Sequence, residues 1–62
     1  MGKKVSIILS TYNEASIINE TIKEIFSTIE NVEIVLVDDN SSDGTLEKVN
    51  SINNKNLKVF SR

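Results

Sequence analysis

The sequence predicts an α/β fold with a parallel sheet built in the order β-α-β-α-β. Two nearly continuous apolar runs, at 5–9 and 34–37, are typical of strands that helices cover on both faces of a sheet. Each run ends in a polar loop, after which apolar residues recur at helical spacing. Right-handed crossovers would arrange the strands in the order 3-2-1. We therefore expect a three-layer half of a doubly wound sheet.

The first half of the chain predicts a strand, a short loop and a long helix. The strand is expected at 4–10, where apolar and β-branched residues dominate. Thr11 and Glu14 have the spacing of a capping box, so the loop at 10–14 is expected to lead directly into a helix. We expect this helix at 15–28, because apolar residues recur at positions 15, 18, 22, 25 and 26.

The second half predicts a buried strand, a shorter helix and a final strand. The central strand is expected at 33–38, where it ends in a carboxylate. Ser42 or Asp43 is expected to cap a helix at 44–53, and we assign Asp43 no further role. The apolar stripe of this helix is narrow and consists of Leu46, Val49 and Ile52. A last strand is expected at 57–60.

Composition excludes several classes of function. The chain has 62 residues with no cysteine and no histidine, so it lacks thiolates and the commonest general base and metal ligand. Its net charge of −2 does not favour nucleic acid as a partner. Its apolar runs are far shorter than the ~20 residues needed to span a bilayer. We therefore expect a cytoplasmic location.

Two acidic loops should face one crevice, because the carboxyl ends of neighbouring parallel strands meet at one edge of the sheet. The loop at 10–14 offers Tyr12 and Glu14, and the loop at 38–43 offers Asp38 and Asp39. Carboxylates accept hydrogen bonds from ribose hydroxyls or a base N–H, but they repel phosphate. These loops therefore suit the nucleoside end of a nucleotide. Neither loop contains a cation, a glycine-rich dinucleotide motif or a Walker A motif.

Two segments together resemble the family 2 glycosyltransferases. They are Val-Ser-Ile-Ile-Leu-Ser-Thr-Tyr-Asn-Glu at 5–14 and Val-Asp-Asp-Asn-Ser-Ser-Asp-Gly-Thr at 37–45. The nearest resemblance is to the dolichol- or polyprenyl-phosphate mannosyltransferases, which have the Rossmann-like GT-A fold. It implies that 1–62 is the N-terminal nucleotide-binding portion of a longer domain. Ser10 departs from the pattern, since the family usually has proline there.

The resemblance implies a role for each motif residue in binding a nucleoside diphosphate sugar. Tyr12 would pack beside the base, and Glu14 would accept hydrogen bonds from ribose hydroxyls. Asp39 would accept an N–H of the base, and Asp38 would order the loop and support Asp39. Thr11 would contribute mainly through its backbone.

The resemblance also implies parts that lie outside this chain. A divalent metal, Mg²⁺ or Mn²⁺, would be held in the longer parent by an acidic motif further along, and the catalytic base would lie there too. The acceptor would be a membrane lipid such as polyprenyl phosphate, which places the parent at the membrane surface. We therefore expect residues 1–62 alone to carry no catalytic or metal-binding residue and to be inactive. We also expect self-association, because the strand at 4–10 would leave one edge unpaired.

Two alternatives remain open at this stage. The segment 34–40 followed by a helix also resembles the start of a response-regulator receiver domain, in which paired acids bind magnesium. That interpretation leaves 5–29 unexplained and lacks the phospho-acceptor aspartate. The other alternative is an oligomerising α/β module that binds no ligand.

Overall fold

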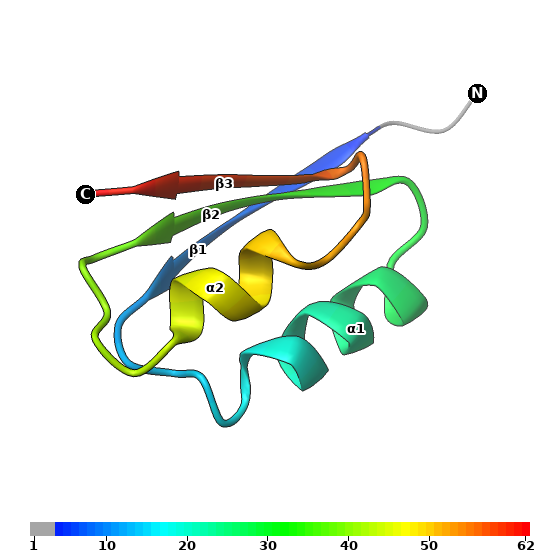
Figure 1. Ribbon diagram of the computed structural model, residues 1–62. Coiled ribbons are helices and arrows are strands. Elements are labelled where there is room, and N and C mark those ends of the chain that lie inside the picture. Colours follow the sequence, from blue (N-terminus) through cyan, green and yellow to red (C-terminus); the bar gives the residue numbers. More distant parts are fainter. Residues whose placement is uncertain (1–3) are drawn as a thin grey trace.

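A computed structural model describes residues 4–62 as three parallel strands and two helices (Figure 1). The elements are β1 (Val5–Thr11), α1 (Ile18–Thr28), β2 (Val32–Asp38), α2 (Thr45–Asn50) and β3 (Leu57–Ser61). β2 lies between β1 and β3 in the sheet. The α/β class, the β-α-β-α-β order and the strand order 3-2-1 are therefore confirmed.

The register of the sheet brings the ends of all three strands to one level. Thr11 of β1 pairs with Asp38 of β2, and Asp38 also pairs with Ser61 of β3. Backbone bonds continue past these pairs: the Asp39 amide donates to the Thr11 carbonyl at 2.8 Å, and the Arg62 amide donates to the Asp38 carbonyl at 2.9 Å. The residues that follow each strand therefore meet at the carboxyl edge of the sheet.

The core lies between the sheet and the two helices, which cover the same face (Figure 1). Its buried members come from α1, β2 and α2, and they are Ile18, Ile22, Ile34, Leu36 and Val49. Along β2 every second residue is buried, from Val32 to Asp38, as expected for a strand with one covered face. Full burial of an aliphatic side chain of this size contributes about 1.5–3 kcal/mol.

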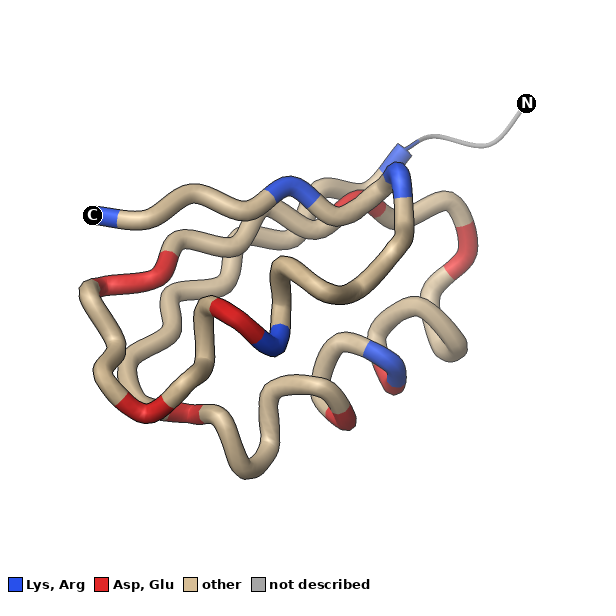
Figure 2. Tube along the Cα trace, in the orientation of Figure 1, with Lys and Arg blue, Asp and Glu red and all other residues tan. Residues whose placement is uncertain are grey.

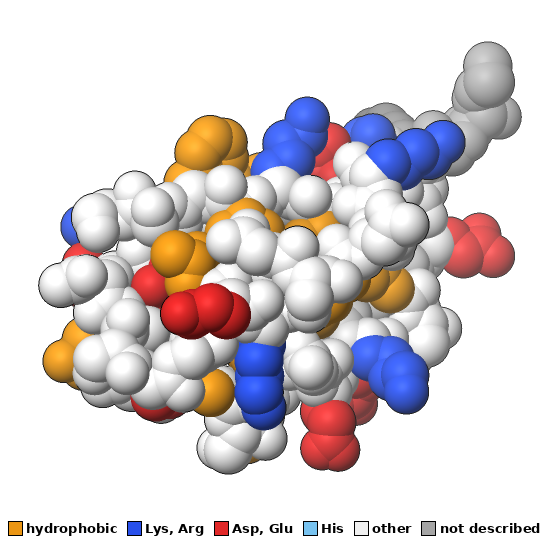
Figure 3. Space-filling view, in the orientation of Figure 1, with side chains coloured by type: hydrophobic (Ala, Val, Ile, Leu, Met, Phe, Trp, Pro, Cys, Tyr) orange, Lys and Arg blue, Asp and Glu red, His pale blue; other side chains and the backbone are white. Residues whose placement is uncertain are grey.

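The expectation of three layers, with strands buried on both faces, is wrong for the described residues. Ile8 of β1 is 72% exposed and Phe60 of β3 is 56% exposed, while Val35 and Val37 of β2 are half-buried. Figure 3 shows apolar side chains reaching the surface above β3. The physical reason is that both crossovers are right-handed and run in the same direction across the sheet. Both helices therefore lie on one side, and the sheet and helices form two layers.

The predicted capping box does not form, and α1 begins three residues later than expected, at Ile18. Thr11 lies in β1, where its hydroxyl donates to the Asp38 carboxylate. The N-cap residue Ile17 makes no side-chain cap. Instead, the amides of Ile17 and Ile18 donate to the Glu14 carbonyl at 3.1 and 2.9 Å.

The second helix, α2, is also shorter than predicted and starts differently. Its N-cap is Gly44, whose φ of 93° is left-handed and costs glycine little. Asp43 still serves the helix start, because its Oδ1 accepts the Thr45 amide at 3.1 Å. Among residues 4–62, no helix is long and apolar enough to cross a membrane.

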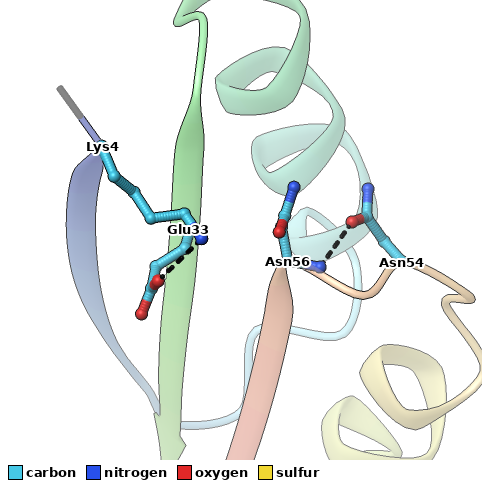
Figure 4. Close-up of polar contacts among 4 residues, drawn as sticks. All are labelled: Lys4, Glu33, Asn54 and Asn56. Carbon is cyan, nitrogen blue, oxygen red and sulfur yellow. Dashed lines mark hydrogen bonds and ion pairs between the residues drawn. The ribbon is translucent and has the colours of Figure 1, made fainter. Parts of the chain in front are cut away.

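At the opposite end of the sheet, polar contacts guide the chain into its strands (Figure 4). Asn54 Oδ1 accepts the Asn56 amide at 2.8 Å, which closes the turn before β3. The Asn56 carbonyl then accepts the Ile34 amide at 2.8 Å and starts the β2–β3 ladder. Lys4 Nζ lies 3.5 Å from Glu33 Oε1, across the start of β1 and β2. This ion pair is partly exposed, so it contributes about 0–1 kcal/mol.

Candidate functional site

The candidate site lies at the carboxyl edge of the sheet, where two loops meet. We call residues 12–17, between β1 and α1, the first loop, and residues 39–44, between β2 and α2, the second loop. Figure 2 shows acidic positions gathered at this end of the molecule, together with the C-terminal Arg62. All five predicted site residues lie here, within or directly beside the two loops.

Asp38 is buried and fully engaged by the protein. Its Oδ1 accepts the Thr11 hydroxyl at 2.9 Å and the Ser41 hydroxyl at 2.6 Å, and its Oδ2 accepts the Ser41 amide at 2.9 Å. Burial alone would raise its pKa, but the hydrogen bonds from Ser41 and Thr11 outweigh this and hold the pKa below the ordinary value of 3.8. Asp38 is therefore an ionised residue that ties the second loop to β1.

The neighbouring Asp39 has the opposite environment. Its side chain is exposed and, among the described residues, forms no hydrogen bond or ion pair. Its backbone is fixed, because its amide donates to the Thr11 carbonyl at 2.8 Å. The next residue, Asn40, turns the chain with a φ of 60°, a left-handed conformation that asparagine tolerates. The Asp39 carboxylate is therefore held at the edge and open to a ligand.

The first loop presents a ring and a second open carboxylate. Tyr12 directly follows β1 and is 62% exposed. Glu14 is half-buried, and within residues 4–62 its carboxylate has no hydrogen-bond or ion-pair partner. Between them, Asn13 has a φ of 52°, again left-handed. Since Thr11 and Asp38 are paired in the sheet, Tyr12 and Asp39 follow them as neighbours across β1 and β2.

Hydrogen bonds hold the two loops together. Three successive amides of the first loop donate to side chains of the second loop and α2: Asn13 N to Ser41 Oγ at 2.8 Å, Glu14 N to Thr45 Oγ1 at 2.9 Å, and Ala15 N to Asp43 Oδ2 at 3.0 Å. In return, the Ser42 amide donates to Asn13 Oδ1 at 2.8 Å. The loops therefore form one hydrogen-bonded unit.

Asp43 has a larger role than the helix start assigned to it from the sequence. Its Oδ1 accepts both the amide and the hydroxyl of Thr45, and its Oδ2 accepts the Ala15 amide. The hydrogen bonds from the Thr45 hydroxyl and the Ala15 amide lower its pKa below the ordinary value. In addition, Lys48 of α2 donates to the Ala15 carbonyl at 2.8 Å. No local pattern in the sequence indicates the two contacts with Ala15, since they span 28 and 33 residues.

Arg62 is a second residue that sequence reasoning missed. It directly follows β3, and its amide donates to the Asp38 carbonyl, so it brings a cation to the same edge. The signal was present, because in a parallel sheet the residue after the third strand must also lie at the carboxyl edge.

The paired carboxylates do not fit a divalent metal. Three donors already occupy the oxygens of Asp38, which leaves only Asp39 open. Over residues 4–62 no group of three or more acidic, histidine or cysteine side chains is placed to hold a metal ion. The edge is also open, with no pocket enclosed by the part of the chain that the structure describes.

Comparison with known proteins identifies the family. The family model for glycosyl transferase family 2 matches residues 6–62. Among curated relatives, a dolichol-phosphate mannosyltransferase of Pyrococcus furiosus is 45% identical over 58 residues, and a cholesterol galactosyltransferase of Borreliella burgdorferi is 39% identical over 62 residues. These matches cover 84% and 95% of the chain but only 15% and 17% of the relatives' length. No solved structure gives a significant match. The chain belongs to glycosyl transferase family 2.

Proposed function

We propose that the carboxyl edge of the sheet binds the nucleoside part of a nucleotide-sugar donor for a glycosyltransferase. One observation carries this proposal: Asp38 is saturated by internal hydrogen bonds, while the adjacent Asp39 is fixed through its backbone and open through its carboxylate. Glu14 adds a second open carboxylate from the first loop, and Tyr12 adds an exposed ring. Family membership supports the donor class.

Each residue has a chemical role in this proposal. A carboxylate only accepts hydrogen bonds, so Asp39 takes an N–H of the base and Glu14 takes ribose hydroxyls. Tyr12 packs its ring beside the base. Thr11 and Asp38 contribute indirectly, by fixing the position of Asp39. The Thr11 carbonyl accepts the Asp39 amide, and the Thr11 hydroxyl donates to the Asp38 carboxylate.

The rest of the reaction belongs to parts of the protein beyond this chain. The names of the two relatives each describe sugar transfer to a lipid, dolichol phosphate or cholesterol. We extend this to a membrane-lipid acceptor, polyprenyl phosphate, for the longer parent of this chain, acting at the cytoplasmic membrane surface. Mg²⁺ or Mn²⁺ would bind the diphosphate there through ligands other than Asp38 and Asp39.

Backbone NMR titration with UDP and with GDP tests the proposal, since it detects weak binding to an open edge. We expect shifts confined to residues 11–14 and 38–40. Asp39→Asn should weaken binding by roughly 10- to 100-fold, the loss of one charge-assisted hydrogen bond. Glu47→Gln, an exposed acid on α2, is the control and should leave the affinity unchanged.

The same titration distinguishes the alternatives. If Mg²⁺ alone shifts Asp38 and Asp39, the chain is receiver-like and the donor proposal is wrong. That alternative requires both carboxylates to face a cation, whereas Asp38 faces three hydrogen-bond donors. If no nucleotide or metal shifts any amide, the chain is a module without a ligand.

A further inference from the structure

The backbone of Glu14 is held on both sides. Its amide donates to Thr45 Oγ1 at 2.9 Å, and its carbonyl accepts the amides of Ile17 and Ile18. Its carboxylate is the part of the residue that remains without a partner among the described residues. The direction in which this carboxylate projects therefore depends on contacts made by the backbone of the same residue.

Thr45 is well suited to fix that backbone. It is completely buried at the first position of α2, so its hydroxyl cannot exchange partners with water. A hydroxyl has a single proton, and Thr45 donates it to Asp43 Oδ1. This leaves the oxygen lone pairs to accept the Glu14 amide. Asp43 thus sets the orientation of the hydroxyl, and the hydroxyl sets the position of Glu14.

Asp43 also acts on the next residue. Its second oxygen accepts the Ala15 amide at 3.0 Å, while Lys48 donates to the Ala15 carbonyl at 2.8 Å. The two peptide groups that follow Glu14 in the chain are therefore held by side chains of the second loop and α2. A ligand contact from Glu14 then requires little further ordering of the loop, which is the usual benefit of preorganisation.

We propose that Thr45 and Asp43 are positioning residues that aim the Glu14 carboxylate at the ribose of the nucleotide. This inference rests on the proposed function, and it assigns Thr45 and Asp43 a role in discriminating sugars by their hydroxyl groups. Neither residue touches the nucleotide; both act through the backbone of the first loop.

The test compares ribonucleotide with 2′,3′-dideoxynucleotide binding in Thr45→Val and Thr45→Ser. Valine keeps the shape of threonine but loses the hydroxyl, whereas serine keeps the hydroxyl. The probe is whichever of UDP and GDP binds the wild-type chain, together with its dideoxy analogue, and NMR titration measures both affinities. We expect the wild type to prefer the ribonucleotide by about tenfold. Thr45→Val should reduce this preference to about threefold or less, and Thr45→Ser should restore it.

The preference ratio separates positioning from stability, because partial unfolding weakens both ligands equally. Thr21→Val is the matched control: its hydroxyl bonds the Ile17 carbonyl on the first turn of α1, away from the second loop. We expect it to keep the wild-type ratio. Hydrogen exchange of the Glu14 amide should become faster in Thr45→Val alone.

The outcomes are distinct. If neither UDP nor GDP binds the wild type, the proposed function fails and this inference fails with it. If a nucleotide binds but folded Thr45→Val keeps the full ribose preference, the proposed function stands and the positioning role is refuted. If Thr45→Val does not fold, Asp43→Asn takes its place, since Asp43 is exposed. An unchanged ratio in that variant also overturns the inference.

Discussion

Asp38 and Asp39 are adjacent and chemically identical, yet the structure predicts opposite responses to the same substitution. Asp38→Asn should destabilise the fold, because three donors converge on its carboxylate. Asp39→Asn should leave stability unchanged, because its exposed carboxylate has no partner in the described chain. Each substitution changes the net charge from −2 to −1, so the pair is matched for charge.

The magnitude follows from the hydrogen bonds. An asparagine at position 38 retains one acceptor oxygen, so its NH₂ group must face at least one of the groups that now donate to Asp38. Thr11 is 3% exposed, so its hydroxyl has almost no access to water, and the Ser41 amide that faces the other oxygen can only donate. Leaving a buried donor unpaired and removing the charge costs about 2–3 kcal/mol. For a domain of this size, this lowers Tm by roughly 10–20 °C. Asp39→Asn should remain within about 0.5 kcal/mol of the wild type.

Thermal unfolding of the three proteins at pH 7, followed by circular dichroism, measures the difference. Hydrogen exchange of the Ser41 amide gives a local readout, since this amide donates to Asp38 Oδ2. It should exchange faster in Asp38→Asn and at the wild-type rate in Asp39→Asn. Equal Tm values for the two variants, or a larger loss for Asp39→Asn, would refute the division of roles.

Four further outcomes are expected. The chain should not transfer sugar from UDP- or GDP-sugars with Mg²⁺ or Mn²⁺; turnover above a heat-treated control would contradict this. Sedimentation equilibrium should show self-association of the chain. Ile8→Lys, on the open face of the sheet, should weaken this association. Leu9→Lys, on the face that the helices cover, should both weaken the association and unfold the chain. The pKa values of Asp38 and Asp43 are lowered in the folded state, so both ionised carboxylates stabilise the fold fully above the ordinary pKa of 3.8. This stabilisation should be lost as the pH falls toward the pKa values of the folded state, and acid unfolding followed by circular dichroism measures the loss. Gly44→Ala should lower the free energy of unfolding in urea by roughly 1–2 kcal/mol, because the φ of 93° strains a residue with a Cβ. A steric clash adds nothing to this cost, since no atom lies within 4 Å of an added Cβ.

The type and order of the elements were predictable because they depend on local patterns. β-branched apolar runs gave the strands, and the 3–4 spacing of isoleucines gave α1. The strand order then followed from the handedness of crossovers. Coverage of the sheet was not predictable in this way. An apolar run indicates that a face is suited to burial, but not whether this part of the chain supplies the covering helix.

The predicted starts of the two helices were wrong for a related reason. Thr11 and Glu14 satisfy the local spacing of a capping box, but the Thr11 hydroxyl has a stronger acceptor in the buried Asp38 carboxylate, 27 residues away. A non-local bond therefore outcompeted the local one. The same holds for Asp43, whose oxygens serve the first loop as well as α2. The sequence indicates which side chains need hydrogen-bond partners, whereas the register of the sheet determines which partners lie within reach.

Strand periodicity explains why the two aspartates have different environments. Alternate residues of β2 face the helices, from Val32 through Leu36, so Asp38 falls on the covered side. The same alternation places Thr11 on the covered side of β1, and the register sets it directly beside Asp38. Two polar side chains buried at the end of paired strands must satisfy each other, and they do. Tyr12 and Asp39 come one position later, beyond the covered rows, and both are exposed. The alternation that buries one pair therefore leaves the next pair free to meet a ligand.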